Sequence, residues 1–243
     1  MRQPSSVVNR VIDDVILGRL DYYRFPDRRA SWGGAFNGQF FRRRMFEEII
    51  AATAPAAIVE TGTYRGTTTK FLAEASGKPV FTVECLPRNY GFAKQNLQVV
   101  RNVTLTLGDS RSFLRRLIAE DRLPQGPIFF YLDAHWGEDL PIFEEIEVIF
   151  KHRPEAVVMI DDFQVPDDPG YGFDNYGVGK ALTLSCLTRL TACFGLVHYF
   201  PNCPAEAESG MKRGCVVIAA LCDVVETLDK LASLRRGGAK VRS

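Results

Sequence analysis

The chain has 243 residues, of which 46% are hydrophobic and 24% are charged, which fits one α/β domain with short additions at its ends. The net charge of +1 excludes a general electrostatic attraction to nucleic acid or to a membrane surface. No apolar stretch approaches the roughly 18 residues of a membrane helix, and Asp13 and Asp14 interrupt the run 11–17 that could otherwise resemble a signal peptide.

Residues 1–55 precede the first predicted strand. Helix-like patterns near 5–20 and 39–52 flank a stretch rich in glycine and aromatic residues at 32–38. We interpret this segment as a helical cover over the active face of the domain. Within it, the run 42–44 is Arg-Arg-Arg, which we expect to form a solvated helix face, with a phosphate site as the less favoured alternative.

Short apolar runs and helical patterns then alternate along the chain. Strands are predicted at 57–60, 80–84, 103–107, 128–133, 156–161, 196–200 and 215–220, and helices at 67–76, 88–98, 110–120 and 139–152. Continuous apolar strands joined by helices indicate a sheet buried on both faces. The prediction is an α/β fold of the doubly wound type, with a mostly parallel seven-stranded sheet over 56–222. A C-terminal helix and a basic, frayed tail follow at 223–243.

The first candidate site is the segment 60–69, Glu-Thr-Gly-Thr-Tyr-Arg-Gly-Thr-Thr-Thr, which follows a strand and begins a helix. Glycines there let the backbone approach a ligand closely, and the helix N-terminus supplies free N–H groups. The spacing excludes a P-loop, and Tyr64 stands where a dinucleotide fingerprint requires glycine. A tight strand-to-helix turn without a ligand remains the alternative.

Acids end the next two strands in the same phase. Glu84 closes the second strand, and Asp109 with Ser110 follows the third. Ligands of open α/β sheets bind at the carboxyl ends of the strands, where an acid can accept hydrogen bonds from ribose hydroxyls. Acids at strand ends also cap helices, so each signal is weak alone and stronger in combination.

Three further carboxylates end the fourth and fifth strands. Asp133 follows one strand, and Asp161 and Asp162 follow the other. Neighbouring parallel strands lie about 4.8 Å apart, so these groups should converge and repel one another unless a cation or a proton intervenes. A hard divalent ion, Mg²⁺ or Ca²⁺, would suit such oxygen ligands. The alternative is that Asp161 and Asp162 cap the following loop while Asp133 orients a substrate.

Two neighbouring features leave alternatives open. His135 can act as a base near neutral pH, or it can be a hydrogen-bonded structural residue beside Trp136. The loop 166–177, rich in glycine, tyrosine and acid, suits either a lid over a substrate or a structured surface loop. The six cysteines form no Cys-x-x-Cys pair, so we expect reduced thiols in a cytoplasmic protein, with a zinc site as the minor alternative.

Taken together, residues 56–163 resemble class I S-adenosylmethionine-dependent methyltransferases. The aspartates are similar in arrangement to those of the metal-dependent O-methyltransferases of the macrocin and cephalosporin-cluster type. The resemblance implies a cofactor site made of Glu60, Gly62, Thr63, Tyr64, Gly66, Thr67, Thr68, Glu84, Asp109, Ser110 and Asp133. It also implies Mg²⁺ or another divalent cation on Asp133, Asp161 and Asp162. That group often carries an acid where this chain has His135, which leaves the general base open.

The expected function is therefore O-methylation of a hydroxyl on a sugar or natural product, with Asp133 and His135 at the reaction centre. The expected partner is a small hydroxylated acceptor, with no nucleic acid and no membrane, and a homo-oligomer is left open. The alternative is a catalytically silent domain that binds S-adenosylmethionine within an assembly, and a nicotinamide oxidoreductase is disfavoured. Aromatic residues that could face a ring-shaped acceptor are Trp32, Phe36, Trp136, Tyr171 and Tyr176.

Overall fold

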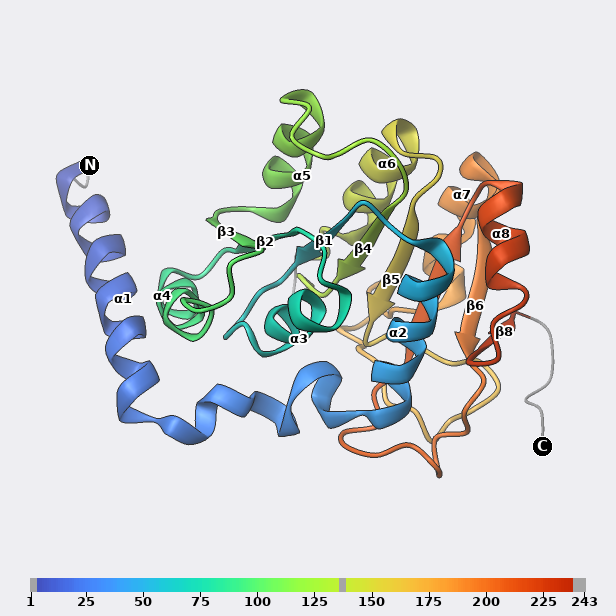
Figure 1. Ribbon diagram of the computed structural model, residues 1–243, viewed down its shortest axis with the longest axis horizontal. Helices are drawn as coiled ribbons and strands as arrows, with labels where there is room; N and C mark the ends of the chain where they lie inside the picture. The colour runs from blue at the N-terminus through green and yellow to red at the C-terminus, as the bar shows by residue number, and fades with distance from the viewer. Residues whose placement is uncertain (1–3, 136–138, 238–243) are drawn as a thin grey trace.

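The computed structural model describes residues 4–135 and 139–237, which form one sheet with helices on both faces (Figure 1). The strands are β1 (Ala57–Thr61), β2 (Val80–Glu84), β3 (Val103–Leu107), β4 (Ile128–Leu132), β5 (Val157–Asp161), β6 (Val197–Pro201), β7 (Cys215–Ala219) and β8 (Leu234–Arg236). Their order is β3-β2-β1-β4-β5-β7-β6-β8. The first five are parallel, whereas β7 runs antiparallel to both β5 and β6. The predicted doubly wound α/β fold is confirmed.

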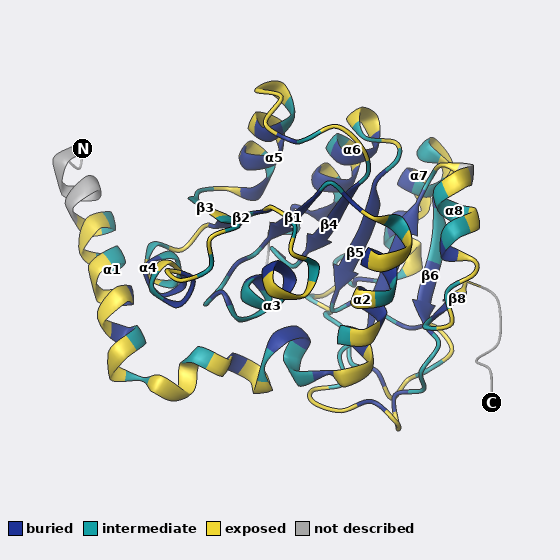
Figure 2. Ribbon diagram, viewed as in Figure 1, coloured by how far each residue is buried: buried dark blue, intermediate teal, exposed yellow. Residues whose placement is uncertain are grey.

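Helices cover the two faces in separate layers. The described helices are α1 (Pro4–Arg24), α2 (Phe40–Thr53), α3 (Thr67–Ser76), α4 (Pro87–Asn96), α5 (Ser110–Ala119), α6 (Ile142–His152), α7 (Leu184–Phe194) and α8 (Cys222–Leu228). One apolar cluster joins α5, α6 and α7 to the sheet, and a second joins α2, α3 and α8 to the opposite face. The strands are therefore buried on both sides, as Figure 2 shows. Alternation along each strand explains this, since Val59 belongs to the first cluster and Ile58 to the second.

The N-terminal segment extends along the edge of the sheet before it reaches the core. Helix α1 packs on α4 at a close crossing, where a Cβ on Gly18 would lie 1.9 Å from the carbonyl oxygen of Arg88. Two short 3₁₀ helices, Pro26–Gly33 and Ala35–Gly38, then pass the edge toward which β4 and β5 point (Figure 1). The predicted helical pieces are both present, and the second of them, α2, is a layer of the fold that buries Phe46 against the sheet.

Residues 234–236 correct the prediction of a frayed tail and of seven strands, while residues 238–243 of that predicted tail lie outside the described residues. Leu234–Arg236 forms an eighth strand, β8, which pairs antiparallel with β6. Arg235 is only 5% exposed, with its guanidinium near the ring of Phe200 and paired with Asp167 at 3.1 Å. The basic residues suggested solvation, but an arginine can bury its aliphatic stem while its charge is paired.

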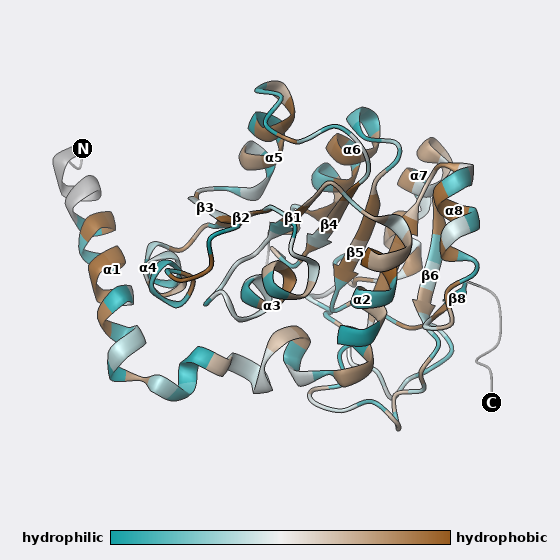
Figure 3. Cartoon of the chain, viewed as in Figure 1, coloured by the Kyte–Doolittle hydropathy of each residue, from teal (hydrophilic) through white to brown (hydrophobic). Residues whose placement is uncertain are grey.

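Apolar residues concentrate in the strands and on the inner faces of the helices (Figure 3). Among the helices of the described residues, none is both long and apolar enough to span a membrane. The fold thus places the carboxyl ends of β1, β2, β4 and β5 at one edge, beneath the N-terminal segment and the loops that follow β5 and β6 (Figure 1).

Candidate active site

The glycine loop after β1 is held against the end of β4. Gly62 has a φ of +88°, and a Cβ there would lie 2.2 Å from the carbonyl oxygen of Asp133. A side chain at this position is therefore excluded by both conformation and space. Gly66, with a φ of +78°, begins α3. The loop between the two glycines joins the end of β1 to the N-terminus of α3, as the sequence predicted.

Glu84 lies at the end of β2 and faces this loop. Its Oε2 accepts a hydrogen bond from the backbone N–H of Tyr64 at 2.7 Å, and its Oε1 accepts one from Leu86 at 2.8 Å. The side chain is 5% exposed, and burial raises the pKa of the carboxyl despite these hydrogen bonds. The chain thus fixes an acid against the glycine loop, at the position where the sequence placed a ribose acceptor.

Glu60 lies beneath the loop and is fully buried. Its Oε2 accepts hydrogen bonds from Thr69 at 2.5 Å and from Thr82 at 2.6 Å, which ties together β1, β2 and α3. Its Oε1 has no hydrogen-bond partner among the described residues. Burial raises the pKa of Glu60 to about 7, outweighing the two threonine hydroxyls. Glu60 thus joins the elements that flank the loop, and its Oε1 can still accept a hydrogen bond.

The threonines that begin α3 contact the N-terminal segment. The hydroxyl of Thr67 donates to the carbonyl of Arg29 at 3.2 Å, and that of Thr68 accepts from the N–H of Phe36 at 3.3 Å. Thr63 shares a hydrogen bond of 2.6 Å with Thr82. The polar side chains of the loop therefore hold the loop and the N-terminal segment together, which places that segment over the helix N-terminus.

The acid after β3 caps α5. Asp109 accepts a hydrogen bond from the N–H of Ser112 at 3.0 Å through Oδ1, and Arg111 donates to its Oδ2. The capping alternative noted for strand-end acids therefore holds here, although each carboxylate oxygen can still accept another bond. Ser110 is 6% exposed and bonds to a buried acid on α6, Glu145.

Glu145 is a buried acid that the sequence analysis did not single out. It is 1% exposed, its Oε2 accepts from Thr61 at 3.4 Å, and its Oε1 has no partner among the described residues. Burial raises its pKa to about 7. It lies on the apolar stripe of α6, and only the register of that stripe could have indicated its burial.

The acids after β4 and β5 meet, together with a histidine. Possible ligand atoms of Asp133, His135 and Asp162 all lie within 4.8 Å of one another. Asp162 has a φ of +51°, an uncommon conformation for a residue other than glycine that strained functional sites often contain. Of the three predicted metal ligands, the structure brings Asp133 and Asp162 into this group and adds His135. No group of three or more ligands among the described residues includes a cysteine.

Asp161 points elsewhere, into a buried ion pair. Arg42 of α2 donates to its Oδ1, and the two side chains are each 1% exposed. The hydroxyl of Tyr131 donates to its Oδ2 at 2.5 Å. The expectation of a solvated face at 42–44 is therefore wrong for Arg42, because its position on the inner face of α2 places it opposite a buried carboxylate that needs a cation.

The pKa values of the acids diverge according to their partners. Burial raises the pKa of Asp133 well above its usual value, and the charges of Asp161 and Asp162 add to this. Burial and the charge of Asp161 raise the pKa of Asp162 to about 7, despite an ion pair with Arg213. Burial alone would also raise the pKa of Asp161, but the Arg42 charge outweighs it and the pKa is lowered. The site concentrates negative charge beyond what its arginines neutralise, which favours binding of a cation.

Arg213 attaches the loop after β5 to this group. Its Nε donates to Asp162 at 2.5 Å, and its Nη2 donates to Asp174 in the predicted lid segment. The hydroxyl of Tyr176 donates to the carboxylate of Asp174, and it also lies 3.1 Å from the carbonyl oxygen of His135. The loop therefore lies over the site, held there by side chains. Arg213 precedes β7 without any local motif, so the sequence offered no signal for its role.

The aromatic residues proposed to face an acceptor divide into separate groups. Phe36 is 1% exposed and packs against Tyr131, and Tyr171 is 3% exposed within the core. Trp32 is 56% exposed, and Tyr176 lies in the loop over the site. Trp136 lies outside the described residues. Among the described members of this set, only Tyr176 is brought beside the acid group.

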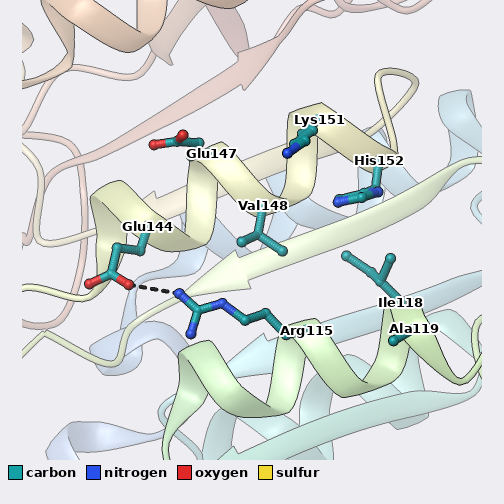
Figure 4. A pocket seen from close by; sticks show the side chains of 8 residues that line it. All are labelled: Arg115, Ile118, Ala119, Glu144, Glu147, Val148, Lys151 and His152. Carbon is teal, nitrogen blue, oxygen red and sulfur yellow. Dashed lines mark hydrogen bonds and ion pairs between the residues drawn. The ribbon is translucent and has the colours of Figure 1, made fainter.

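A surface hollow of about 480 Å³ lies between α5 and α6, away from this edge of the sheet. Its lining residues are Arg115, Ile118, Ala119, Glu144, Glu147, Val148, Lys151 and His152 (Figure 4). None of them comes from the carboxyl end of a strand. His152 is exposed. The candidate chemistry therefore lies at the strand ends and not in this hollow.

We expect Arg42→Met to destabilise the protein by about 3–5 kcal/mol, because it leaves the carboxylate of Asp161 buried without its cation. Arg44→Met, on the exposed side of the same helix, should change the free energy of unfolding by less than about 0.5 kcal/mol. Urea unfolding measures both. Similar stabilities for the two variants would show that the ion pair is not formed as described.

We expect Glu145→Gln to change the pH dependence of stability. The folded-state pKa of about 7 lies above the ordinary value of 4.5, so the wild type loses stability as pH rises through this window. The unfolding free energy of the variant minus that of the wild type should rise by about 3 kcal/mol between these pH values. Urea unfolding across pH measures this difference. Glu144→Gln, at an exposed neighbouring position, should show no such rise, and a flat difference for Glu145→Gln would contradict the assignment.

Comparison with known proteins identifies the fold. No protein-family model matches the sequence, and no curated protein matches it. The structure is similar to the O-methyltransferase from Bacillus cereus in complex with SAH, with a TM-score of 0.52, 16% identity, and coverage of 74% of this chain and 80% of that one. It is also similar to the O-methyltransferase TomG from Streptomyces achromogenes in complex with SAM (TM-score 0.51, 18% identity, coverage 74% and 79%). An SAH-bound methyltransferase from Podospora anserina gives a TM-score of 0.52 at 13% identity, with coverage of 91% and 98%. The chain thus has the fold of class I methyltransferases, which confirms the fold that the resemblance implied.

Proposed function

We propose that this chain is an S-adenosylmethionine-dependent methyltransferase that methylates a hydroxyl oxygen of a small molecule, such as a sugar or a natural product. Its fold is shared with methyltransferases that were solved with SAM or SAH. The observation that carries the proposal is the carboxylate of Glu84, which is held against the glycine loop at the end of β2. In nucleotide-binding α/β sheets, an acid at this position accepts hydrogen bonds from the ribose.

The residues around the loop fit this cofactor. Glu84 would accept hydrogen bonds from the ribose hydroxyls, and the buried Oε1 of Glu60 offers a further acceptor without a partner among the described residues. The backbone from Gly62 to Thr68 would surround the remainder of the cofactor, because the glycines keep this segment free of bulk. Two further positions would close the site, Asp109 with Ser110 after β3 and Asp133 directly after β4.

The acid group would prepare the acceptor. When bound, the cofactor supplies a methyl group on a positively charged sulfur, and a divalent ion lowers the pKa of a hydroxyl beside it. Asp133 and Asp162 would hold the ion, because they bring carboxylate oxygens within 4.8 Å of each other and of a ring nitrogen of His135. Asp161 has less capacity for an ion, since Arg42 and Tyr131 occupy its oxygens.

His135 can contribute in one of two ways. Burial lowers its pKa, so the imidazole is neutral near pH 7 and its Nε2 can accept either the hydroxyl proton or an ion. Arg213 and Tyr176 would hold the loop over the acceptor and exclude water from the reacting atoms. The protein would thus act mainly by alignment and by preparing the oxygen nucleophile.

We expect Glu84→Ala to weaken S-adenosylmethionine binding by about 100-fold, because two charge-assisted hydrogen bonds to the ribose are lost. Isothermal titration calorimetry measures this, with Cys85→Ala, at the exposed neighbouring position, as the control. Circular dichroism verifies that both variants fold. Absence of binding by the wild type would remove the proposed function, whereas binding without turnover on any hydroxylated acceptor would favour the silent cofactor-binding domain.

We expect chelation to abolish methyl transfer. Labelled S-adenosylmethionine and a pool of hydroxylated acceptors provide the assay, and activity should fall to background after complete chelation and return when a divalent cation is added. S-adenosylmethionine binding should survive chelation, because the proposed cofactor contacts share only Asp133 with the ion ligands. Full activity in a metal-free protein would overturn the metal-dependent form of the proposal.

A further inference from the structure

The imidazole of His135 is buried, and its Nε2 makes no hydrogen bond to the part of the chain that the structure describes. The residue is 2% exposed, and its Nε2 has no hydrogen-bond partner within residues 4–135 and 139–237. The carboxylate of Asp174 lies 4.0 Å away, beyond hydrogen-bonding distance. A buried polar atom without a partner costs free energy, so its retention indicates that a ligand completes it.

The lone nitrogen faces two carboxylates that also have free capacity. One ring nitrogen of His135 and a carboxylate oxygen from each of Asp133 and Asp162 lie within 4.8 Å of one another. Two ligands on opposite sides of one ion, each at about 2.1 Å from it, lie about 4.2 Å apart. A point among three atoms that are at most 4.8 Å apart lies at most about 2.8 Å from each, so the three atoms can close on a single ion with shifts of up to about 0.7 Å.

The surrounding contacts favour this set of three over the three aspartates. Arg42 and Tyr131 bond the two oxygens of Asp161, and this acid does not belong to the group of ligand atoms found among the described residues. Tyr176 and Asp174, which are bonded to each other, lie beside His135, with the Tyr176 hydroxyl 3.1 Å from its carbonyl oxygen. Arg213 bonds Oδ1 of Asp162 and leaves Oδ2 available.

We propose that His135 is a metal ligand through Nε2, together with Asp133 and Asp162, and that the site selects a first-row transition ion over Mg²⁺. Mg²⁺ prefers oxygen ligands, whereas an imidazole nitrogen favours ions such as Fe²⁺, Co²⁺ and Zn²⁺. Ligation uses the same lone pair that would accept a proton, so a His135 that binds the ion is not the general base. This inference refines the ion site of the proposed function, and it concerns binding alone.

The test compares two ions on two variants. Calorimetric titration of the wild type should show Co²⁺ binding at least about tenfold tighter than Mg²⁺. His135→Asn should weaken Co²⁺ binding by more than about tenfold while changing Mg²⁺ binding by less than about threefold. His198→Asn is the matched control. His198 lies on β6 and bonds to Thr191 of α7, so this variant should leave both affinities unchanged.

A spectroscopic measurement decides the question even if the variant fails to fold. Electron spin echo modulation of the Mn²⁺-loaded wild type should contain the ¹⁴N signal of a directly bound imidazole, and His135→Asn should lack it. Absence of that signal in the wild type, or equal losses of Co²⁺ and Mg²⁺ binding in His135→Asn, would overturn the inference. Calorimetry with S-adenosylmethionine separates the two proposals, because failed cofactor binding removes the proposed function while the ¹⁴N signal still establishes the ligand.

Discussion

The buried pair between Arg42 and Asp161 connects the parts of this molecule that make the site. It joins α2, which precedes the sheet in sequence, to the end of β5, and Tyr131 extends the contact to β4. The backbone carbonyl of Arg213 accepts a bond from the same guanidinium, so the loop before β7 meets at the same point. A buried charge must be paired, and this requirement helps to fix how α2 lies on the sheet.

The same pair determines which acids remain available for chemistry. Because Asp161 has its own cation, its pKa is lowered, whereas burial raises the pKa values of Asp133 and Asp162 and the charges of neighbouring carboxylates add to this. Adjacent carboxylates at the ends of neighbouring strands thus acquire different roles from their partners. One holds the architecture together, and the other two retain an affinity for a cation.

The two halves of the proposed site differ in how they are built. The cofactor half depends mainly on backbone geometry, since Gly62 lies so near the carbonyl of Asp133 that no side chain fits. Glu84 and Glu60 hold this loop from two sides through hydrogen bonds to main chain and threonines. The acid half depends on side chains from distant segments, and its loop is attached by Arg213. A change of acceptor could therefore arise in the second half while the first is retained.

Local patterns predicted the strands, the helices and the glycine loop. Strand burial shows in continuous apolar runs, and a turn that needs a positive φ shows in glycine, so β1, the loop and α3 could be located from neighbouring residues alone. The convergence of Asp133 and Asp162 also followed, because parallel strands end at the same edge. The partners of these acids did not follow. Arg42 lies 119 positions from Asp161, and Arg213 lies 51 positions from Asp162, and no local rule joins residues so far apart.

For this protein, the sequence by itself determined the α/β fold, the edge of the sheet that carries the chemistry, and the acids that gather there. Only the tertiary structure decided that Arg42 is buried, that Asp161 turns away from the group and that His135 joins it. The basic composition of β8 predicts a solvated tail. Its position in the sheet depends instead on β6 and Asp167, which lie elsewhere in the chain. Hydrophobic periodicity and turn chemistry are encoded within a few residues, whereas the pairing of buried charges is set by the packing of segments that meet only in the folded chain.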